Sequence, residues 1–240
     1  MKVLGISAGT SETSASTRLA QKVADAAEGG AEIIGLKPYA RDIADAITRG
    51  YPSERLAKLF DAVDKADALV AVTPIYNAMP SGLFISFFDV LPEETLQGKP
   101  VALGATGGSP RHSLVIEQAM RPMFVYMHAM VPTTAVYAAT EDWGAPGEGF
   151  EGSTGRTLGN RILREGQELA NLVAVAKGLT PNHSPAQGEL DGGAQSGGSQ
   201  RGDQNSEGRP NQPERSDLSS AEDAAIANFP DFVPFDQLLK

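Results

Sequence analysis

The chain has 240 residues, no cysteine and a formal net charge of −10 at neutral pH. The lack of cysteine excludes disulfides, zinc–thiolate sites, iron–sulfur clusters and thiol nucleophiles. The negative charge argues against nucleic acid or an anionic membrane as the main partner, because both attract clustered Lys and Arg. No apolar stretch approaches the roughly 20 residues of a membrane-spanning helix, and the start "MKVLGIS" lacks the features of a signal peptide. We therefore expect a cytoplasmic protein.

Apolar runs alternate with helical stretches over the first 180 residues. The runs are bounded by Gly, Pro or polar residues, as buried parallel strands are, and they span residues 2–7, 31–36, 68–73, 100–106 and 131–140. The stretches with helical spacing span about 15–27, 53–65, 79–89, 112–128 and 154–177. Five such alternations predict an α/β fold with a parallel sheet, right-handed crossovers and helices on both faces. Five strands fit the doubly wound flavodoxin-like order 2-1-3-4-5.

The composition changes sharply after about residue 182. Residues 183–217 are rich in Gly, Gln, Ser, Pro and charge, and cannot bury enough apolar surface to offset the entropy of ordering, so we expect a disordered linker. Residues 218–240 return to an apolar segment that contains "FPDFVPFDQLL". The expected layout is thus a domain over 1–182, a linker and an apolar tail. The tail is either a docking segment for a partner or a piece that packs on the domain itself.

The loop after the first strand, within "GISAGTSETSASTR" over 5–18, is rich in hydroxyl groups and precedes a helix. In an open parallel sheet, ligands bind at the carboxyl ends of the strands near the switch in strand order. The N-terminus of a helix offers free N–H groups and a partial positive charge for a phosphate. The hydroxyls that could surround such a phosphate belong to Ser7, Thr10, Ser14, Ser16 and Thr17. The alternative is an N-cap in a flexible Ser/Thr loop.

Two further loops follow strands at the same expected edge of the sheet. "TPIYNAMPSGLFISFFDVL" over 73–91 places an aromatic residue, Tyr76, where a ring could pack beside a flat cofactor. "GATGGSPRHS" over 104–113 carries two adjacent glycines that expose backbone N–H groups. Alone, the second loop is more typical of a Pro-rich loop whose Tyr completes the core, and the third of a plain turn. The three loops together, at one edge of the sheet, favour a ligand site.

These motifs resemble those of the NAD(P)H-dependent FMN reductases. The carrying patterns are "S…T…S-x-S-T", "P-I-Y-N-x-x-x-P-S-G-L…D" and "T-G-G-S-x-R-H", and the chain is especially similar to the actinobacterial-type FMN reductases. The resemblance implies that FMN phosphate binds Ser7, Ser14, Ser16 and Thr17. It also implies that the flavin ring lies against Pro74, Ile75, Tyr76 and Asn77, with Thr106, Gly107 and Gly108 at its other edge. Gly107 is expected so close to the ring that a side chain there would collide with it.

The resemblance implies a flavin reductase that transfers hydride from NADPH or NADH to FMN. Such a transfer needs stacked rings and little acid–base work, which suits a site of hydroxyls and glycines. Arg111 is expected to meet the phosphates of the nicotinamide cofactor or the flavin edge, the alternative being a polar turn in solvent. We further expect a homo-oligomer, specifically a homodimer, and a flavin-dependent monooxygenase as partner. The alternatives are a flavodoxin-like electron carrier and a quinone or azo reductase that uses bound FMN.

Overall fold

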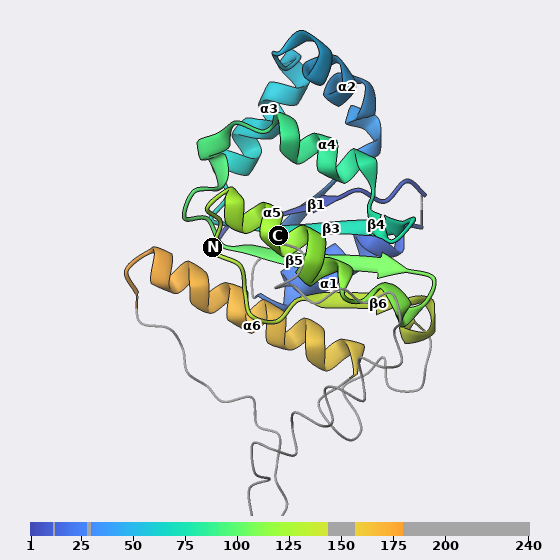
Figure 1. Ribbon diagram of the computed structural model, residues 1–240. Helices are drawn as coiled ribbons and strands as arrows, with labels where there is room; N and C mark the ends of the chain where they lie inside the picture. The colour runs from blue at the N-terminus through green and yellow to red at the C-terminus, as the bar shows by residue number, and fades with distance from the viewer. Residues whose placement is uncertain (12, 28–29, 144–156, 180–240) are drawn as a thin grey trace, which may run out of the picture. The chain divides into compact units, whose positions relative to one another are not determined.

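The computed structural model describes residues 1–11, 13–27, 30–143 and 157–179 (Figure 1). Its parallel strands lie in the order β2-β1-β3-β5-β6, which confirms the predicted doubly wound order of five parallel strands. A two-residue strand, β4, pairs antiparallel with β3 and interrupts the numbering. The strands are β1 Val3–Ser7, β2 Ala31–Gly35, β3 Ala68–Tyr76, β4 Met79–Pro80, β5 Val101–Gly107 and β6 Val136–Ala139. The predicted linker over 183–217 and tail over 218–240 lie outside the described residues.

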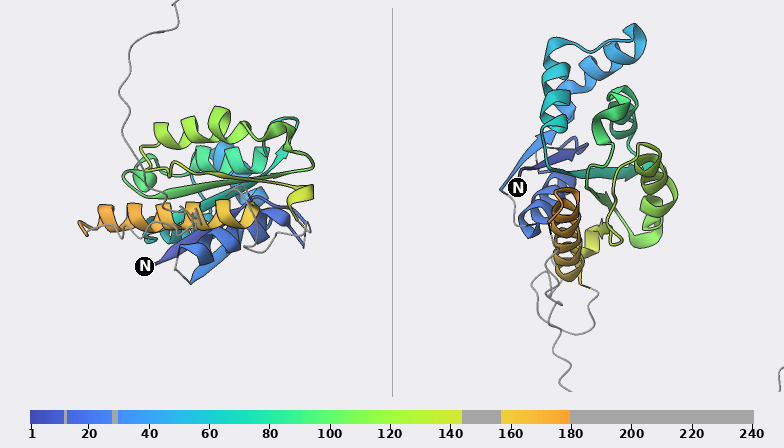
Figure 2. Two further views of the ribbon diagram at one scale, coloured as in Figure 1. Left: turned by 90° about the horizontal axis from the view of Figure 1, so that it is seen from below. Right: turned by 90° about the vertical axis from the view of Figure 1, so that its left-hand side faces the viewer.

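Helices cover both faces of the sheet (Figure 2). Alternate strand residues point to opposite faces, so Leu69 packs into one apolar cluster and Val70 into the other. Helices α1 and α6 form the second cluster, and α2 to α5 form the first. The helices are α1 Ala15–Ala26, α2 Ala40–Arg49, α3 Glu54–Asp64, α4 Gly82–Val90, α5 Arg121–Tyr126 and α6 Leu158–Ala176. Among the described residues, no helix is long and apolar enough to cross a membrane.

Two elements were missed by the sequence analysis. Helix α2 buries only Ile43 and Ala46, so its apolar stripe is short, and its clearest signal is Gly50, which ends it in the left-handed conformation at φ 80°. The second is the hairpin of β3 and β4. Its turn residues Asn77 and Ala78 have φ values of 50° and 60°, as a two-residue type I′ turn requires. The stretch over 73–81 is therefore an extended hairpin rather than a Pro-rich loop.

The predicted helix over 112–128 is divided into three pieces. A 3₁₀ turn, η3 Pro110–His112, precedes a π-helix, η4 Ile116–Met120, which leads into α5. Pro122 has no N–H and so cannot continue the regular α-helical hydrogen-bond ladder through this junction. The wider π turn accommodates that break, while Ile116, Met120 and Phe124 still reach the core.

Strand β6 is shorter than the predicted 131–140. Carboxyl groups of α6 accept hydrogen bonds from backbone N–H groups that a longer strand would have paired. Backbone pairing of β5 with β6 starts at Gly104 and Val136. Just before it, the Leu103 N–H donates to the buried Glu165 carboxyl at 2.9 Å. Glu168 likewise accepts from the Thr134 N–H at 2.7 Å. Side chains from α6 therefore satisfy backbone groups that a longer strand would have paired.

The two carboxyls have opposite pKa shifts. Complete burial raises the pKa of Glu165 well above its usual range, and the Leu103 hydrogen bond offsets this only in part. Burial would also raise the pKa of Glu168, but the hydrogen bonds from Thr134 and Arg164 outweigh it and lower that pKa. Glu165 is thus the carboxyl that resists ionisation in the folded protein.

This difference predicts the pH dependence of stability. A folded pKa above the unfolded value means that the Glu165 contribution is complete below about pH 4.3, the ordinary glutamate pKa, and is lost as pH rises through the folded pKa. Glu165→Gln, which keeps the acceptor oxygen and cannot ionise, should flatten that loss, as measured by urea unfolding across a pH series. Glu168→Gln is the matched control. The Glu168 contribution to stability changes with pH in the opposite direction, because a lowered folded pKa means that the contribution is lost as pH falls. Parallel pH profiles for wild type and Glu165→Gln would contradict the assignment.

Candidate functional site

The carboxyl ends of three adjacent strands bring the candidate loops together. β1 pairs with β3 and β3 with β5, both in parallel, so the segments that follow Ser7, Tyr76 and Gly107 leave the same edge of the sheet (Figure 1). One direct contact ties the first of these segments to the end of the neighbouring strand: the hydroxyls of Ser16 in α1 and Thr106 in β5 hydrogen-bond at 2.7 Å. The predicted residues therefore converge at one edge, as the strand order requires.

The loop after β1 folds back on the first turn of α1. Ser14 is the N-cap of α1, and its Oγ accepts from the Thr17 N–H at 3.2 Å. The hydroxyls of Ser7 and Thr17 hydrogen-bond at 2.9 Å. A Cβ on Gly9 would lie 1.7 Å from the Ser14 Oγ, so only glycine allows this approach. Three of the five predicted hydroxyls, those of Ser7, Ser14 and Thr17, are thus gathered at the start of a helix.

The other two predicted hydroxyls lie apart from that group. Thr10 is exposed farther along the loop. Ser16 is only 2% exposed and faces β5, where it bonds Thr106. The structure therefore gives Ser16 a partner inside the fold, and the Ser16–Thr106 pair fastens α1 to the end of β5.

The second candidate segment is the β3–β4 hairpin. Its base is braced where the Ser81 N–H donates to the Thr73 Oγ1 at 3.0 Å, and the Thr73 hydroxyl lies 3.2 Å from the Ser81 Oγ. Ser81 is also the N-cap of α4. Pro74 and Ile75 are half-buried in β3, whereas Asn77 is exposed in the turn. Tyr76, the last residue of β3, is 52% exposed, so its side chain is accessible at this edge of the sheet.

The third candidate segment follows β5. Thr106 is buried, and Gly108 is exposed with open space within 4 Å of the position that a Cβ would take. Gly107 is different, because a Cβ there would lie 2.1 Å from the hydroxyl of Tyr137. The crowding expected at Gly107 thus comes from the protein itself. Arg111 lies exposed in η3 just beyond.

The sequence analysis missed the residues that brace this edge. Tyr137 is buried on β6, and its hydroxyl donates to the Ser109 carbonyl at 2.8 Å. Burial, and secondarily the nearby Asp142 carboxylate, raise the pKa of Tyr137, so the phenol remains a donor at neutral pH. Thr73 and Ser81 lie within the quoted stretch over 73–91, but the sequence analysis gave them no role. The signal for these two was a hydroxyl directly beside each of the prolines Pro74 and Pro80, whereas Tyr137 is distant in sequence and gave none.

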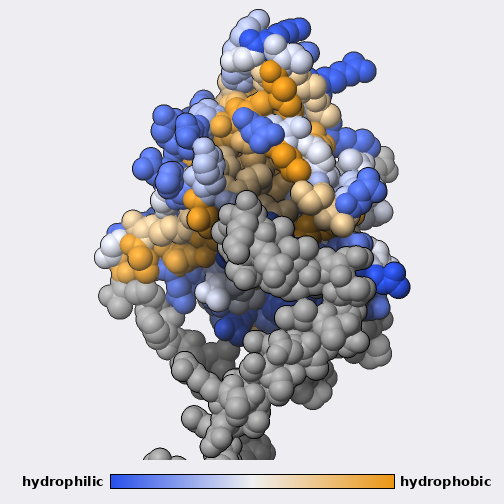
Figure 3. Space-filling model, in the orientation of Figure 1, coloured by the Kyte–Doolittle hydropathy of each residue, from blue (hydrophilic) through white to orange (hydrophobic). Residues whose placement is uncertain are grey.

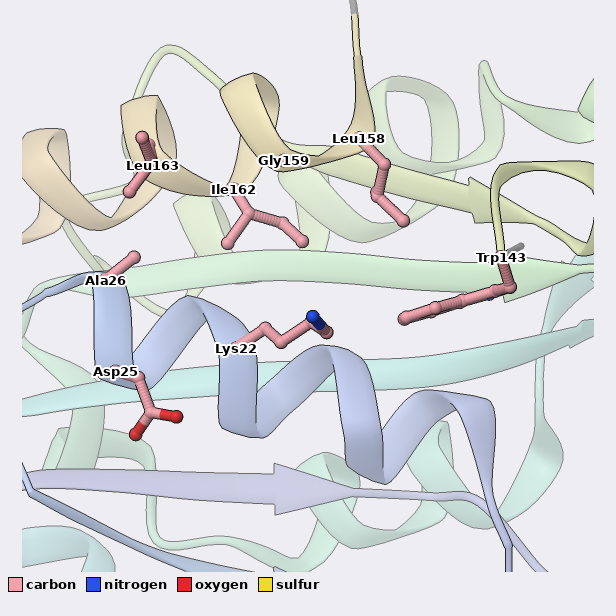
Figure 4. Close-up of a pocket in the computed structure, with 8 residues that line it drawn as sticks. All are labelled: Lys22, Asp25, Ala26, Trp143, Leu158, Gly159, Ile162 and Leu163. Atoms are coloured by element: carbon pink, nitrogen blue, oxygen red, sulfur yellow. The ribbon is translucent and has the colours of Figure 1, made fainter. Parts of the chain in front are cut away.

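Two cavities lie away from the three loops. One of about 290 Å³ separates α1 from α6 (Figure 4), and Trp143 lines it with the Arg18 guanidinium 3.7 Å from the ring centre. The other lies between α2 and α4, and on this side of the molecule apolar residues gather among charged ones (Figure 3). Neither of these two cavities is lined by a residue of the three loops. Within the described part of the chain, no group of His, Asp and Glu side chains could hold a metal ion.

The edge therefore offers hydroxyls and backbone N–H groups at a helix start, an exposed aromatic ring and a glycine facing open space. Residues 1–144, which contain all of these, match the family described as NADPH-dependent FMN reductase. The chain belongs to this family. The match spans every strand of the sheet and ends before α6.

Individual relatives agree with that assignment. The chain is 34% identical over 143 residues to the NADH-dependent FMN reductase SfnE of Pseudomonas putida, covering 58% of this chain and 77% of that protein. It is 30% identical over 146 residues to an FMN reductase (NADPH) of Pseudomonas aeruginosa, covering 59% of this chain and 78% of that protein. Among solved structures, an oxidoreductase of Corynebacterium diphtheriae has a TM-score of 0.66 at 35% identity, covering 72% of this chain and 97% of that one.

Proposed function

We propose that this protein catalyses hydride transfer from NADPH or NADH to FMN bound at the carboxyl edge of β1, β3 and β5. The observation that carries the proposal is the convergence of three segments of complementary chemistry on that edge. A helix start with Ser7, Ser14 and Thr17 suits a phosphate. The half-exposed ring of Tyr76 and the open space at Gly108 suit a flat ring system. The residues present thus fit FMN.

FMN supplies the ring that accepts the hydride, and the protein's own residues bind and orient it. The N-terminus of α1 and the Thr17 hydroxyl hold the phosphate, and Thr10 adds a donor at the rim. Pro74 to Asn77 support one side of the ring, while Thr106 to Gly108 line the other edge. Arg111, exposed beside this edge, meets the phosphates of the nicotinamide nucleotide. Relatives named for NADH and for NADPH both match, so either nucleotide remains a candidate donor.

Beyond the FMN site, we propose a subfamily, an oligomeric state and a role for the C-terminal segments. The similarity to the Corynebacterium oxidoreductase supports a place among the actinobacterial-type reductases. We propose a cytoplasmic homodimer, since Met79, Val125 and Tyr126 are exposed apolar or aromatic residues near the hairpin and on α5. The domain ends near residue 182, and residues 183–217 link it to a tail over 218–240 that docks a flavin-dependent monooxygenase.

The reductase activity is tested by mixing catalytic amounts of protein with NADPH or NADH and excess FMN. We expect many turnovers, dependent on FMN, followed as loss of nicotinamide absorbance. At most one equivalent of nucleotide oxidised per protein would contradict the reductase and indicate an electron carrier. Substituting a quinone or an azo dye for the excess FMN, with the protein loaded with FMN beforehand, tests the alternative acceptors. Faster turnover with either would move the assignment to that acceptor.

The phosphate site is tested by replacing Thr17 and Ser16 one at a time and then together. Thr17→Ala should weaken FMN binding about tenfold, because a hydroxyl bond to a charged group contributes about 1.5–3 kcal/mol. Ser16→Ala should instead lower thermal stability, because Thr106 loses its buried partner. The double change should do both. Thr48→Ala, on the exposed side of α2, is the control. FMN affinity that is unchanged in the double variant, measured by fluorescence quenching, would remove the phosphate from this loop.

The role of the tail is tested by ending the chain after residue 182, six residues beyond α6. We expect the shortened protein to keep its circular dichroism spectrum, FMN affinity and turnover with free FMN, because the family match lies within residues 1–144. Its delivery of reduced flavin to a monooxygenase should fall, because a tether raises local concentration. Loss of FMN binding or of folding would instead make residues 183–240 part of the domain.

A further inference from the structure

Tyr137 connects the edge strand β6 to the segment that follows β5. It is 5% exposed, and its backbone pairs with Ala105 in the β5–β6 ladder. Its hydroxyl reaches beyond that ladder and donates to the carbonyl of Ser109 at 2.8 Å, a contact between residues 28 positions apart. This bond holds a backbone group that belongs to neither strand.

The same hydroxyl also lies beneath Gly107. A Cβ on Gly107 would lie 2.1 Å from the Tyr137 hydroxyl oxygen and 3.1 Å from the ring carbon that carries it. The phenol therefore fills the space where any side chain at position 107 would go. Gly107 has no positive φ, so this contact, rather than backbone strain, is what requires glycine there. A single phenol thus fixes both Gly107 and Ser109, and Gly108 between them faces open space.

Tyr137 is itself held from the other side. The guanidinium of Arg161, on α6, donates from Nη1 to the Tyr137 carbonyl at 2.5 Å and from Nη2 to the Asp142 carboxylate at 3.1 Å. The second oxygen of Asp142 accepts from the Ala139 N–H at 2.8 Å. Strand β6 is therefore bonded to α6 directly at Tyr137 and, through Asp142, at Ala139. The backbone that carries the phenol is thus held in place.

We infer that Tyr137 is a positioning residue for flavin binding, which presets the backbone of Gly107, Gly108 and Ser109 in the conformation that receives the ring. This inference rests on the FMN site proposed above. Tyr137 is buried beneath the loop and acts through the glycines rather than by touching the ligand. A loop ordered in the free protein loses less entropy when the ligand binds, so the effect of the phenol is on affinity.

The first test compares Tyr137→Phe with wild type and with Tyr51→Phe. Tyr51 is 63% exposed beside the end of α4 and loses the same hydroxyl far from the loop. For Tyr137→Phe we expect the Kd and the KM for FMN to rise five- to tenfold, with kcat at saturating FMN within twofold of wild type. A purely structural loss would lower kcat in proportion to the folded fraction and leave KM unchanged. A Kd for FMN within twofold of wild type would overturn the inference.

The second test uses the collision at position 107 and needs no ligand. Gly107→Ala should lower the thermal unfolding temperature of the FMN-free protein by several degrees, because the Cβ meets the phenol oxygen. In the Tyr137→Phe background the same substitution should have a much smaller effect, because the colliding atom is gone. Equal losses in both backgrounds would show that the phenol does not occupy this space, and would overturn the inference.

A third variant separates the inference from the proposed site. Gly108→Val places its side chain into the open space where the ring would lie, so it should weaken FMN binding more than tenfold with little change in thermal stability. Gly30→Val, equally open but before β2 at the opposite edge of the sheet, is the control. If Gly108→Val weakens FMN binding and Tyr137→Phe does not, the site stands and the positioning role fails. If Gly108→Val binds FMN like wild type, the proposed site fails, and the inference fails with it.

Discussion

The hydrogen bond from the Leu103 N–H to the buried Glu165 carboxyl determines how the last strand joins the sheet. Backbone pairing of β5 with β6 begins only at Gly104, one residue after Leu103, and an unpaired N–H buried in a sheet would be costly. Glu165 supplies the acceptor from α6, and Arg161 of the same helix donates to the Tyr137 carbonyl of β6, so α6 is bonded to both strands. Because Tyr137 of β6 bonds the Ser109 carbonyl, the loop after β5 is tied to the same helix through these two strands. Glu165, buried where α6 packs on the sheet, is thus linked through β5 to the candidate segment that follows this strand.

The candidate site is held largely by hydroxyl pairs within the protein. Each of the pairs Ser7–Thr17 and Ser16–Thr106 shares one hydrogen, so one hydroxyl of each pair keeps its own hydrogen for another acceptor. The Ser14 Oγ already accepts from the helix N–H. Counting hydroxyls in the loop sequence therefore overstates the donors that a phosphate could receive. In the proposed FMN site, the remaining hydroxyl hydrogens would act together with the free N–H groups of α1, so the phosphate would lie near the helix axis rather than along the loop.

The sequence predicts the strand order and the three loops because these follow from short apolar runs with polar ends. It misses α2, whose buried face is only Ile43 and Ala46, and the hairpin, because Asn-Ala is a weak signal for a type I′ turn. Glu165 could have been noticed, since it lies between Ile162 and Leu169 on the buried side of α6. Tyr137 could not, because a tyrosine in a strand is ordinary and its partners Gly107 and Ser109 are brought near only by the pairing of β5 and β6.

At the candidate site, buried residues position the backbone, whereas exposed residues line the surface. This difference suggests how one fold can serve several flavin-dependent reactions. Thr106 and Tyr137 are buried, and the pairs they form set the backbone on which a flavin would rest. Tyr76, Met79 and Arg111 are exposed at the same edge, so substituting them changes no core packing. Hydride transfer depends on how the rings are stacked. With FMN bound as proposed, the exposed residues would alter which donor or acceptor stacks on the flavin, while the buried residues would keep the flavin ring in place. Changes of acceptor within this fold are therefore expected at the exposed rim, and losses of flavin affinity at the braces.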